Sequence, residues 1–493
     1  MRAKHHFPAF ILVLLAWMAA CSNPVPPNVP DTAPVEPKDA PAAAPAAPPP
    51  PPNVVFILID TWRADSLQAE RAGMPVMPKL RAFAEASRWY TFAITQCSWT
   101  KPSMVSMFSS QYPMVHNVMF GVTHQFVADQ NMEIDVVPPD LETMPAWFKA
   151  NGYATAGIQS NANLSPETKF DRGFDSYYFE AYPEFRGNEI TDKAIETWQS
   201  MSGPRFLYVH YMDPHRPYDP PQRYRELMQV PAPPVDELPL LENFGSYYDQ
   251  KVMFHLGAIA NRTVPELSDA AREYVRALYD AECRFADDEV DRLIQHIRAN
   301  DPNAIIVLTA DHGEELWDHG SLGHGMTVYQ EGIHIPLVFS VPGEKPQRID
   351  AGVELIDILP TLANKLQLPA PETWQGLNLF GYTPDPSAPR PLYSMTKTSL
   401  RHLNKHWDTV IVNKEKLIVN RVDDTNQLFH LDTDAGERSN LSGNLAEDVA
   451  RLRTLLDDRN ASNQAHPQYR SESTTEAVDS ELVEKLKTQG YVR

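Results

Sequence analysis

Short apolar runs recur between residues 53 and 345, separated by longer stretches whose apolar residues follow a helical spacing. The first run, Val54–Ile59, is continuous and rich in β-branched residues, which is typical of a strand buried on both faces of a parallel sheet. Similar runs follow at Ala154–Ile158, Phe206–Tyr211, Ala304–Thr309 and Pro336–Val341.

The helical stretches lie between these runs, at Met77–Ser87, Leu141–Asn151, Glu189–Met201 and Leu267–Asn300. Strands that alternate with helices predict an α/β fold with a central, mainly parallel sheet flanked by helices. In such folds, functional side chains gather at the carboxyl ends of the strands.

The pattern weakens after Gly343, where we expect a smaller α+β subdomain. Its predicted helices are Glu354–Leu366 and Leu445–Arg459, and its predicted antiparallel strands lie in Thr409–Arg421 and Gln427–Leu431. Residues 217–266 are rich in proline and acidic residues and predict a long loop or insertion. The expected organisation is a main domain at 53–345, a subdomain at 346–465 that completes the fold, and a polar tail at 466–493.

The N-terminus carries a targeting signal. Basic residues precede the apolar run Phe7–Trp17, which is too short to span a bilayer and is typical of a signal peptide. The following Met18-Ala-Ala-Cys21 resembles a bacterial lipobox, in which residues 1–20 are removed and Cys21 is lipidated. Ordinary cleavage after Ala20 is the alternative. Ser22, in place of an aspartate, favours the outer membrane.

Residues 21–52 are rich in proline and alanine and predict an extended, semi-rigid tether. We therefore expect an exported, lipid-anchored protein that faces the periplasm or the cell surface.

The formal net charge is −21. An acidic surface repels phosphate backbones, so we expect no nucleic-acid binding. A small anionic substrate stays compatible with this charge, because a bound metal reverses the field locally. Cys97 and Cys283 are too few for a disulfide framework, and we expect buried thiols.

Acidic residues close two of the predicted strands. Asp60 follows Val54–Ile59, and Asp311 with His312 follows Ala304–Thr309. A buried carboxylate is costly unless it meets a cation, although a single strand-end aspartate is more often a helix cap. Taken together, the two sites predict a metal centre.

An ordered set of segments resembles the sulfatase family of the alkaline-phosphatase superfamily. The segments are Asn53–Leu67, Thr100–His116, Phe206–Pro221, Leu308–Gly343 and Leu428–Leu441. The resemblance implies a metal-dependent ester hydrolase with its catalytic domain at residues 53–345.

The resemblance also implies that Asp60, Thr100, Asp311 and His312 hold one divalent metal and that Thr100 is the nucleophile. The imidazole ligand favours Zn²⁺ or Mn²⁺ over Ca²⁺. A second metal is possible near His324.

Position 100 departs from the family pattern. Sulfatases carry there a cysteine that becomes formylglycine, in the motif Cys-x-Pro-Ser-Arg, whereas this chain has Thr100-Lys-Pro-Ser-Met104. Formylglycine cannot form on threonine, and the arginine is replaced by Met104. A threonine ester must be released by attack of water or another acceptor at phosphorus or sulfur. We therefore expect a phosphate monoester or diester substrate, as in a phosphodiesterase.

The resemblance implies that His215 and His324 bind the ester and assist proton transfer; hydrogen bonding to loop backbone is the alternative. Asn161 is a candidate substrate-binding residue or a turn cap. We expect structural roles for His116 and His319.

Other functions remain open from the sequence. They are a true sulfuric ester hydrolase, a transferase of the phosphoethanolamine or phosphoglycerol type, and a catalytically idle surface binding protein of the same fold. Neither the natural ester nor the oligomeric state follows from the sequence.

Overall fold

The computed structural model describes residues 51–121, 133–242, 265–397 and 405–477. The predicted signal peptide, Cys21 and nearly all of the tether lie outside these residues. Within the described residues, no helix is both long enough and apolar enough to cross a membrane.

A central eight-stranded sheet forms the core. Its order is β13 (Gln347–Glu354), β4 (Arg88–Ile94), β12 (His334–Ser340), β9 (Ile305–Thr309), β1 (Val54–Ile59), β8 (Arg205–Tyr211), β6 (Ala154–Gln159) and β7 (Ser176–Phe179). β12 runs antiparallel to its two neighbours, and the other pairings are parallel. β1 lies inside the sheet and is buried along its whole length. The predicted α/β fold with a mainly parallel sheet is confirmed.

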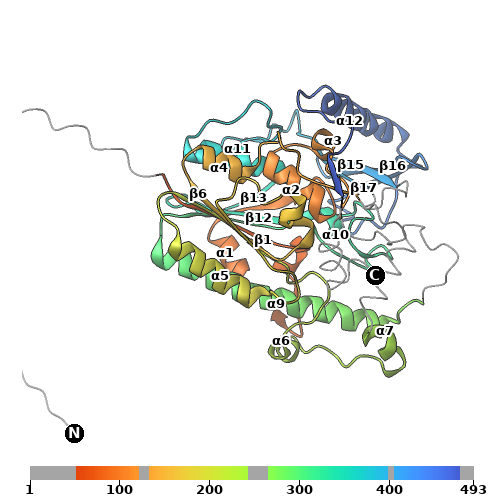
Figure 1. Ribbon diagram of the computed structural model, residues 1–493. Helices are drawn as coiled ribbons and strands as arrows, with labels where there is room; N and C mark the ends of the chain where they lie inside the picture. Colours follow the sequence, from red (N-terminus) through yellow and green to blue (C-terminus); the bar gives the residue numbers. More distant parts are fainter. Residues whose placement is uncertain (1–50, 122–132, 243–264, 398–404, 478–493) are drawn as a thin grey trace, which may run out of the picture. The chain divides into compact units, whose positions relative to one another are not determined.

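Helices cover both faces of this sheet (Figure 1). One face carries α1 (Pro78–Glu85), α5 (Gly187–Ser200) and α9 (Asp269–Asn300), and the other carries α2 (Thr100–Ser109), α4 (Met144–Ala150) and α11 (Ile358–Leu366). The long helix α9 begins where the Ser268 side chain accepts a hydrogen bond from the backbone N–H of Ala271. Its apolar positions recur at helical spacing and are buried, which explains why the sequence predicts it well.

The C-terminal subdomain contains an antiparallel sheet of β14 (Leu392–Lys397), β15 (His406–Val412), β16 (Glu415–Asn420) and β17 (Thr425–His430), with α12 (Ala446–Gln464) packed on it. The predicted strand region Thr409–Arg421 is a hairpin. Asn413 and Lys414 form its turn with φ of 48° and 68°, the left-handed pair that a two-residue hairpin turn requires. The predicted antiparallel subdomain is confirmed.

Three segments differ in detail from the expectations. β13 joins the main sheet, so this sheet extends beyond residue 345. The segment expected as a loop at 217–266 contains the short helices α6 (Gln222–Leu227) and α7 (Leu238–Glu242), while residues 243–264 lie outside the described ones. In the expected polar tail, β18 (Thr475–Ala477) pairs with β5 (Glu133–Asp135).

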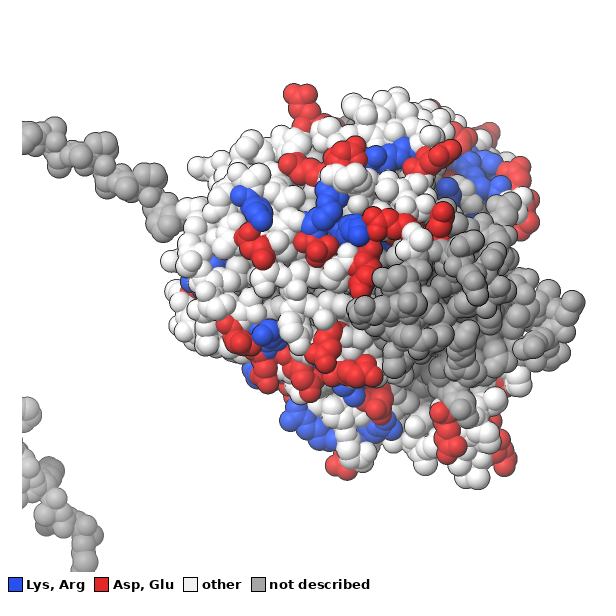
Figure 2. All heavy atoms as spheres, viewed as in Figure 1, with Lys and Arg blue, Asp and Glu red and all other residues white. Residues whose placement is uncertain are grey.

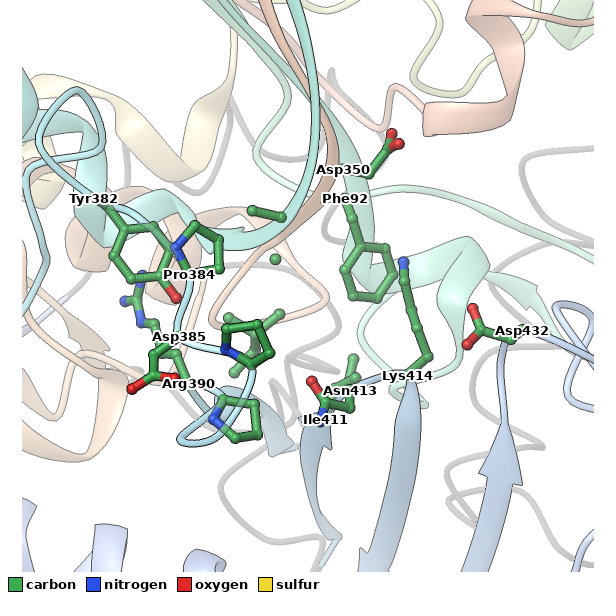
Figure 3. A pocket seen from close by; sticks show the side chains of 15 residues that line it. Phe92, Asp350, Tyr382, Pro384, Asp385, Arg390, Ile411, Asn413, Lys414 and Asp432 are labelled. Carbon is green, nitrogen blue, oxygen red and sulfur yellow. The ribbon is translucent and has the colours of Figure 1, made fainter.

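A cavity of about 390 Å³ lies between the edge of the main sheet and the C-terminal sheet (Figure 3). Phe92, Tyr382 and Lys414 line it, and the Lys414 ammonium lies 3.0 Å from the centre of the Phe92 ring. None of the site residues predicted from the sequence lines this cavity. On the visible face of the molecule, acidic and basic side chains are interspersed (Figure 2).

Candidate active site

The carboxyl ends of two strands and the start of one helix meet at one edge of the central sheet. β1 and β9 are parallel neighbours, so the residues that follow them, Asp60 and Asp311, emerge at the same edge of the sheet. Thr100 is the first residue of α2, where the helix dipole favours negative charge. All three side chains are buried.

Asp60, Asp311 and His312 form a compact buried cluster, with one potential ligand atom from each lying within 4.8 Å of the others. His312 Nε2 lies 3.2 Å from Asp311 Oδ2, 3.8 Å from Asp60 Oδ1 and 3.2 Å from the Thr100 hydroxyl. The two carboxylate oxygens that face this imidazole, Asp60 Oδ1 and Asp311 Oδ2, have no hydrogen-bond partner among the described residues. A buried carboxylate oxygen that no hydrogen-bond donor reaches is costly unless a cation lies nearby, so this donor set fits a divalent metal.

The surrounding backbone orients these groups. His312 Nδ1 donates to the Gly313 carbonyl at 2.8 Å, which directs Nε2 toward the carboxylates. Asp311 Oδ1 accepts hydrogen bonds from the backbone N–H groups of Thr61 and His312, at 3.3 and 2.9 Å. Thr61 has a φ of 53°, an unfavourable conformation for a β-branched residue. Such strain beside Asp60 is typical of a functional site.

The second oxygen of Asp60 is held by two donors. Asp60 Oδ2 accepts from Asn161 Nδ2 at 2.7 Å and from His210 Nε2 at 2.9 Å. The Tyr208 hydroxyl in turn donates to His210 Nδ1 at 2.7 Å. Asn161 also caps a short 3-10 helix by accepting from the backbone N–H of Asn163. The structure thus places Asn161 as a support for Asp60 and as a cap.

Sequence reasoning missed His210 and Tyr208, because both lie within the apolar run of β8. A signal was nevertheless present. The two residues are two positions apart and therefore share one face of the strand. A pair of buried polar side chains inside such a strand needs hydrogen-bond partners.

Three histidine rings lie side by side. The His324 ring centre is 4.6 Å from that of His312 and 5.2 Å from that of His215. His215 Nδ1 donates to the Arg216 carbonyl at 2.6 Å, and His324 Nδ1 lies 3.3 Å from a carboxylate oxygen of Glu314. Glu314, which sequence reasoning did not single out, follows Asp311-His312-Gly313 directly and is buried.

Burial and neighbouring charges shift the pKa values of His312 and Asp60 in opposite directions. Burial by itself lowers the pKa of His312, but the neighbouring Asp311 and Asp60 raise it to about 9. Burial by itself raises the pKa of Asp60, but the hydrogen bond from His210 and the nearby imidazoles hold it well below its usual range.

For the other ionisable groups of the site, burial determines the direction of the pKa shift. Burial lowers the pKa of His215 to about 4, and burial together with His312 lowers that of His324 to about 3. Burial raises the pKa of Glu314 to about 7, against the opposing effect of His215, His312 and Arg216.

The remaining residues singled out in the sequence make contacts within the folded structure, outside the buried cluster. His116 Nε2 lies 2.9 Å from the Ser106 hydroxyl, and His319 pairs with Glu331 at 2.6 Å. Cys97 and Cys283 are buried free thiols, as expected. Met104 is fully buried in the apolar core.

The chain is similar in sequence to known proteins. The sequence profile of the family described as Sulfatase matches residues 52–367. The chain is 25% identical to human iduronate 2-sulfatase over 371 residues, which cover 65% of this chain and 65% of that protein. The chain therefore spans about two thirds of the length of this relative.

Two solved structures are similar in fold. A phosphonate monoester hydrolase from Silicibacter pomeroyi has a TM-score of 0.66 and 21% identity, over 87% of this chain and 99% of that one. A 2-O GAG sulfatase has a TM-score of 0.65 and 19% identity, over 88% of this chain and 96% of that one. Because the family profile covers well over half of the chain, the protein belongs to the sulfatase family.

Proposed function

We propose that the protein is a metal-dependent hydrolase of phosphate monoesters or diesters, with Thr100 as the nucleophile. The observation that carries the proposal is the 3.2 Å contact of the Thr100 hydroxyl with His312 Nε2, beside two buried carboxylate oxygens without hydrogen-bond partners among the described residues. An alcohol at the end of such a cluster is suited to nucleophilic catalysis.

Asp60, Asp311, His312 and Thr100 would hold the metal. When bound, a divalent cation supplies positive charge that lowers the pKa of the Thr100 hydroxyl and offsets charge developing on the ester. Two carboxylates, one imidazole and one hydroxyl favour Zn²⁺ or Mn²⁺ over Ca²⁺.

The chain's own groups then carry the reaction. Thr100 Oγ1, in its deprotonated form, attacks phosphorus, and the leaving group departs on the opposite side. An anionic ester next to His215 favours the protonated ring, which donates through Nε2 to an ester oxygen. The covalent Thr100 ester is then cleaved by water.

Phosphate is favoured over sulfate by the residues at positions 100 and 104. Position 100 holds a threonine, and Met104 is buried in the core, so neither a formylglycine nor an arginine acts there. The purified protein is expected to cleave bis(4-nitrophenyl) phosphate or 4-nitrophenyl phosphate at least about 10-fold faster than 4-nitrophenyl sulfate, because a threonine ester needs attack at its central atom. Faster turnover of the sulfate would instead make the protein a sulfuric ester hydrolase.

We also propose that Cys21 anchors the protein to the membrane through lipid. The apolar run followed by Met18-Ala-Ala-Cys21 supports this proposal. Replacing Cys21 with serine is expected to move the protein from the membrane fraction to the soluble fraction of bacterial cells, because without the thiol no lipid is attached and the buried acyl chains that bind the membrane are lost. Fractionation with immunodetection measures this, and a membrane-bound Cys21→Ser protein would contradict it.

A further inference from the structure

Each histidine of the site is fixed through its Nδ1 atom. His312 and His215 donate from Nδ1 to backbone carbonyls, at 2.8 and 2.6 Å. His324 differs, because its Nδ1 lies 3.3 and 3.4 Å from the two carboxylate oxygens of a side chain, Glu314. With Nδ1 engaged in this way, the Nε2 atom of His324 is left for other partners.

A short β-ribbon brings Glu314 and His324 together. β10 (Glu315–Leu316) pairs antiparallel with β11 (Leu322–Gly323), and Glu315 lies opposite Gly323. The residue before the first strand therefore lies beside the residue after the second. The segment after the ribbon also packs closely on the residue before α2, since a Cβ atom added at Gly325 would lie only 3.1 Å from the Cβ atom of Trp99, which precedes Thr100.

The hydrogen-bond partner of each imidazole indicates the role that the ring can take in the reaction. His312 Nε2 faces Asp60 and Asp311 and belongs to the cation site. A side-chain oxygen that accepts from Nδ1–H holds an imidazole in the Nδ1–H tautomer, which leaves the lone pair of the ring on Nε2. Of the three rings, His324 is the one that contacts a buried carboxyl group through Nδ1.

We propose that Glu314 is a positioning residue that holds His324 in the Nδ1–H tautomer, so that His324 Nε2 accepts the proton of the water molecule that hydrolyses the Thr100 ester. The inference rests on the proposed function and concerns its second chemical step. Under this proposal, Glu314 and His324 promote transfer of the phosphoryl group from Thr100 to water.

The step balances in atoms and electrons. The water oxygen forms a bond to phosphorus, and one water proton passes to His324 Nε2. The bond between phosphorus and Thr100 Oγ1 breaks, and its electron pair returns to the threonine oxygen in the deprotonated form that began the cycle. His324 then releases its proton to solvent, which restores the neutral ring.

The test measures the breakdown of the covalent ester itself. The protein is mixed with bis(4-nitrophenyl) phosphate and quenched in acid at successive times, and mass spectrometry follows the phosphoryl adduct on Thr100. In Glu314→Ala, formation of the adduct and the first release of 4-nitrophenol are expected to match the wild type. Adduct decay is expected to slow about 10- to 100-fold, the usual effect of removing a group that orients a functional histidine.

A matched control lies next to Glu314 in the chain. Glu315 is equally buried, but its carboxylate accepts from the Thr327 hydroxyl at 3.0 Å. Glu315→Ala should leave adduct decay at the wild-type rate. Glu314→Gln keeps an acceptor oxygen for Nδ1–H and should recover part of the lost rate; it also serves as the test variant if Glu314→Ala does not fold.

A double variant separates positioning from a purely structural role. If Glu314 acts only through His324, then His324→Ala and Glu314→Gln/His324→Ala should decay at the same slow rate. Wild-type decay in Glu314→Ala, or equal slowing of adduct formation and decay, would overturn the inference and leave the proposed function intact. Absence of any adduct on Thr100 in the wild type, despite turnover, would refute the covalent mechanism itself.

Discussion

Replacing Thr100 with alanine is expected to lower kcat by about 10⁴-fold or more, the range seen when a covalent nucleophile is deleted. The reason is geometric. The Thr100 hydroxyl lies 3.2 Å from His312 Nε2 at the start of α2, and its removal leaves the ester without an attacking group at that position. The measurement is steady-state hydrolysis of bis(4-nitrophenyl) phosphate at saturating substrate.

Two controls distinguish a lost nucleophile from a damaged site. Asp60, Asp311 and His312 remain in Thr100→Ala, so its metal content by elemental analysis should stay close to that of the wild type. Thr100→Ser keeps a hydroxyl group and should retain measurable turnover. If Thr100→Ala hydrolyses the diester at the wild-type rate, Thr100 has no part in the reaction, and the proposed mechanism must be abandoned.

The core of the fold follows from the sequence because its pattern is local. β1, β6, β8 and β9 lie inside the sheet with helices on both faces, so their residues are nearly all buried and mostly apolar. In α9, burial of one face imposes a helical period over 32 residues. Such elements carry their own signature, and a short window of sequence is enough to detect them.

The strands that the sequence did not reveal have mixed composition. β4 carries Arg88 and Thr91, which interrupt its apolar run, and the edge strand β13 is largely polar over its first half. These strands form because they pair with each other and because β4 also pairs with β12. Pairing between segments more than 200 residues apart depends on tertiary context, which a local pattern does not contain.

The candidate site shows the same division. Asp60 and Asp311 stand out because each ends an apolar strand, although 251 positions separate them and only the β1–β9 pairing makes them neighbours. His210 hydrogen-bonds to Asp60 and Glu314 contacts His324, but neither residue stands out in the sequence. One lies inside a strand, and the other depends on the register of the two-residue strands β10 and β11. The sequence therefore indicates the cation ligands more readily than the residues that orient them.

Removal of the metal is expected to abolish turnover and to destabilise the fold together. Without a cation, Asp60 Oδ1 and Asp311 Oδ2 are buried oxygens without hydrogen-bond partners among the described residues. A ligand present at 100 times its dissociation constant stabilises the folded state by about 2.7 kcal/mol. Dialysis against a chelator should therefore lower both the activity, to background, and the midpoint of thermal unfolding.

Readdition of metals then tests the ligand set. Zn²⁺ or Mn²⁺ should restore activity and thermal stability together, and Ca²⁺ should restore less, because an imidazole nitrogen is a poor ligand for Ca²⁺. Thr100→Ala serves as the control, since it keeps both carboxylates and the imidazole and should show the same thermal shift while remaining inactive. A chelated protein that holds no metal yet keeps full activity and an unchanged unfolding midpoint would mean that the buried cluster of Asp60, Asp311 and His312 is not a functional metal site.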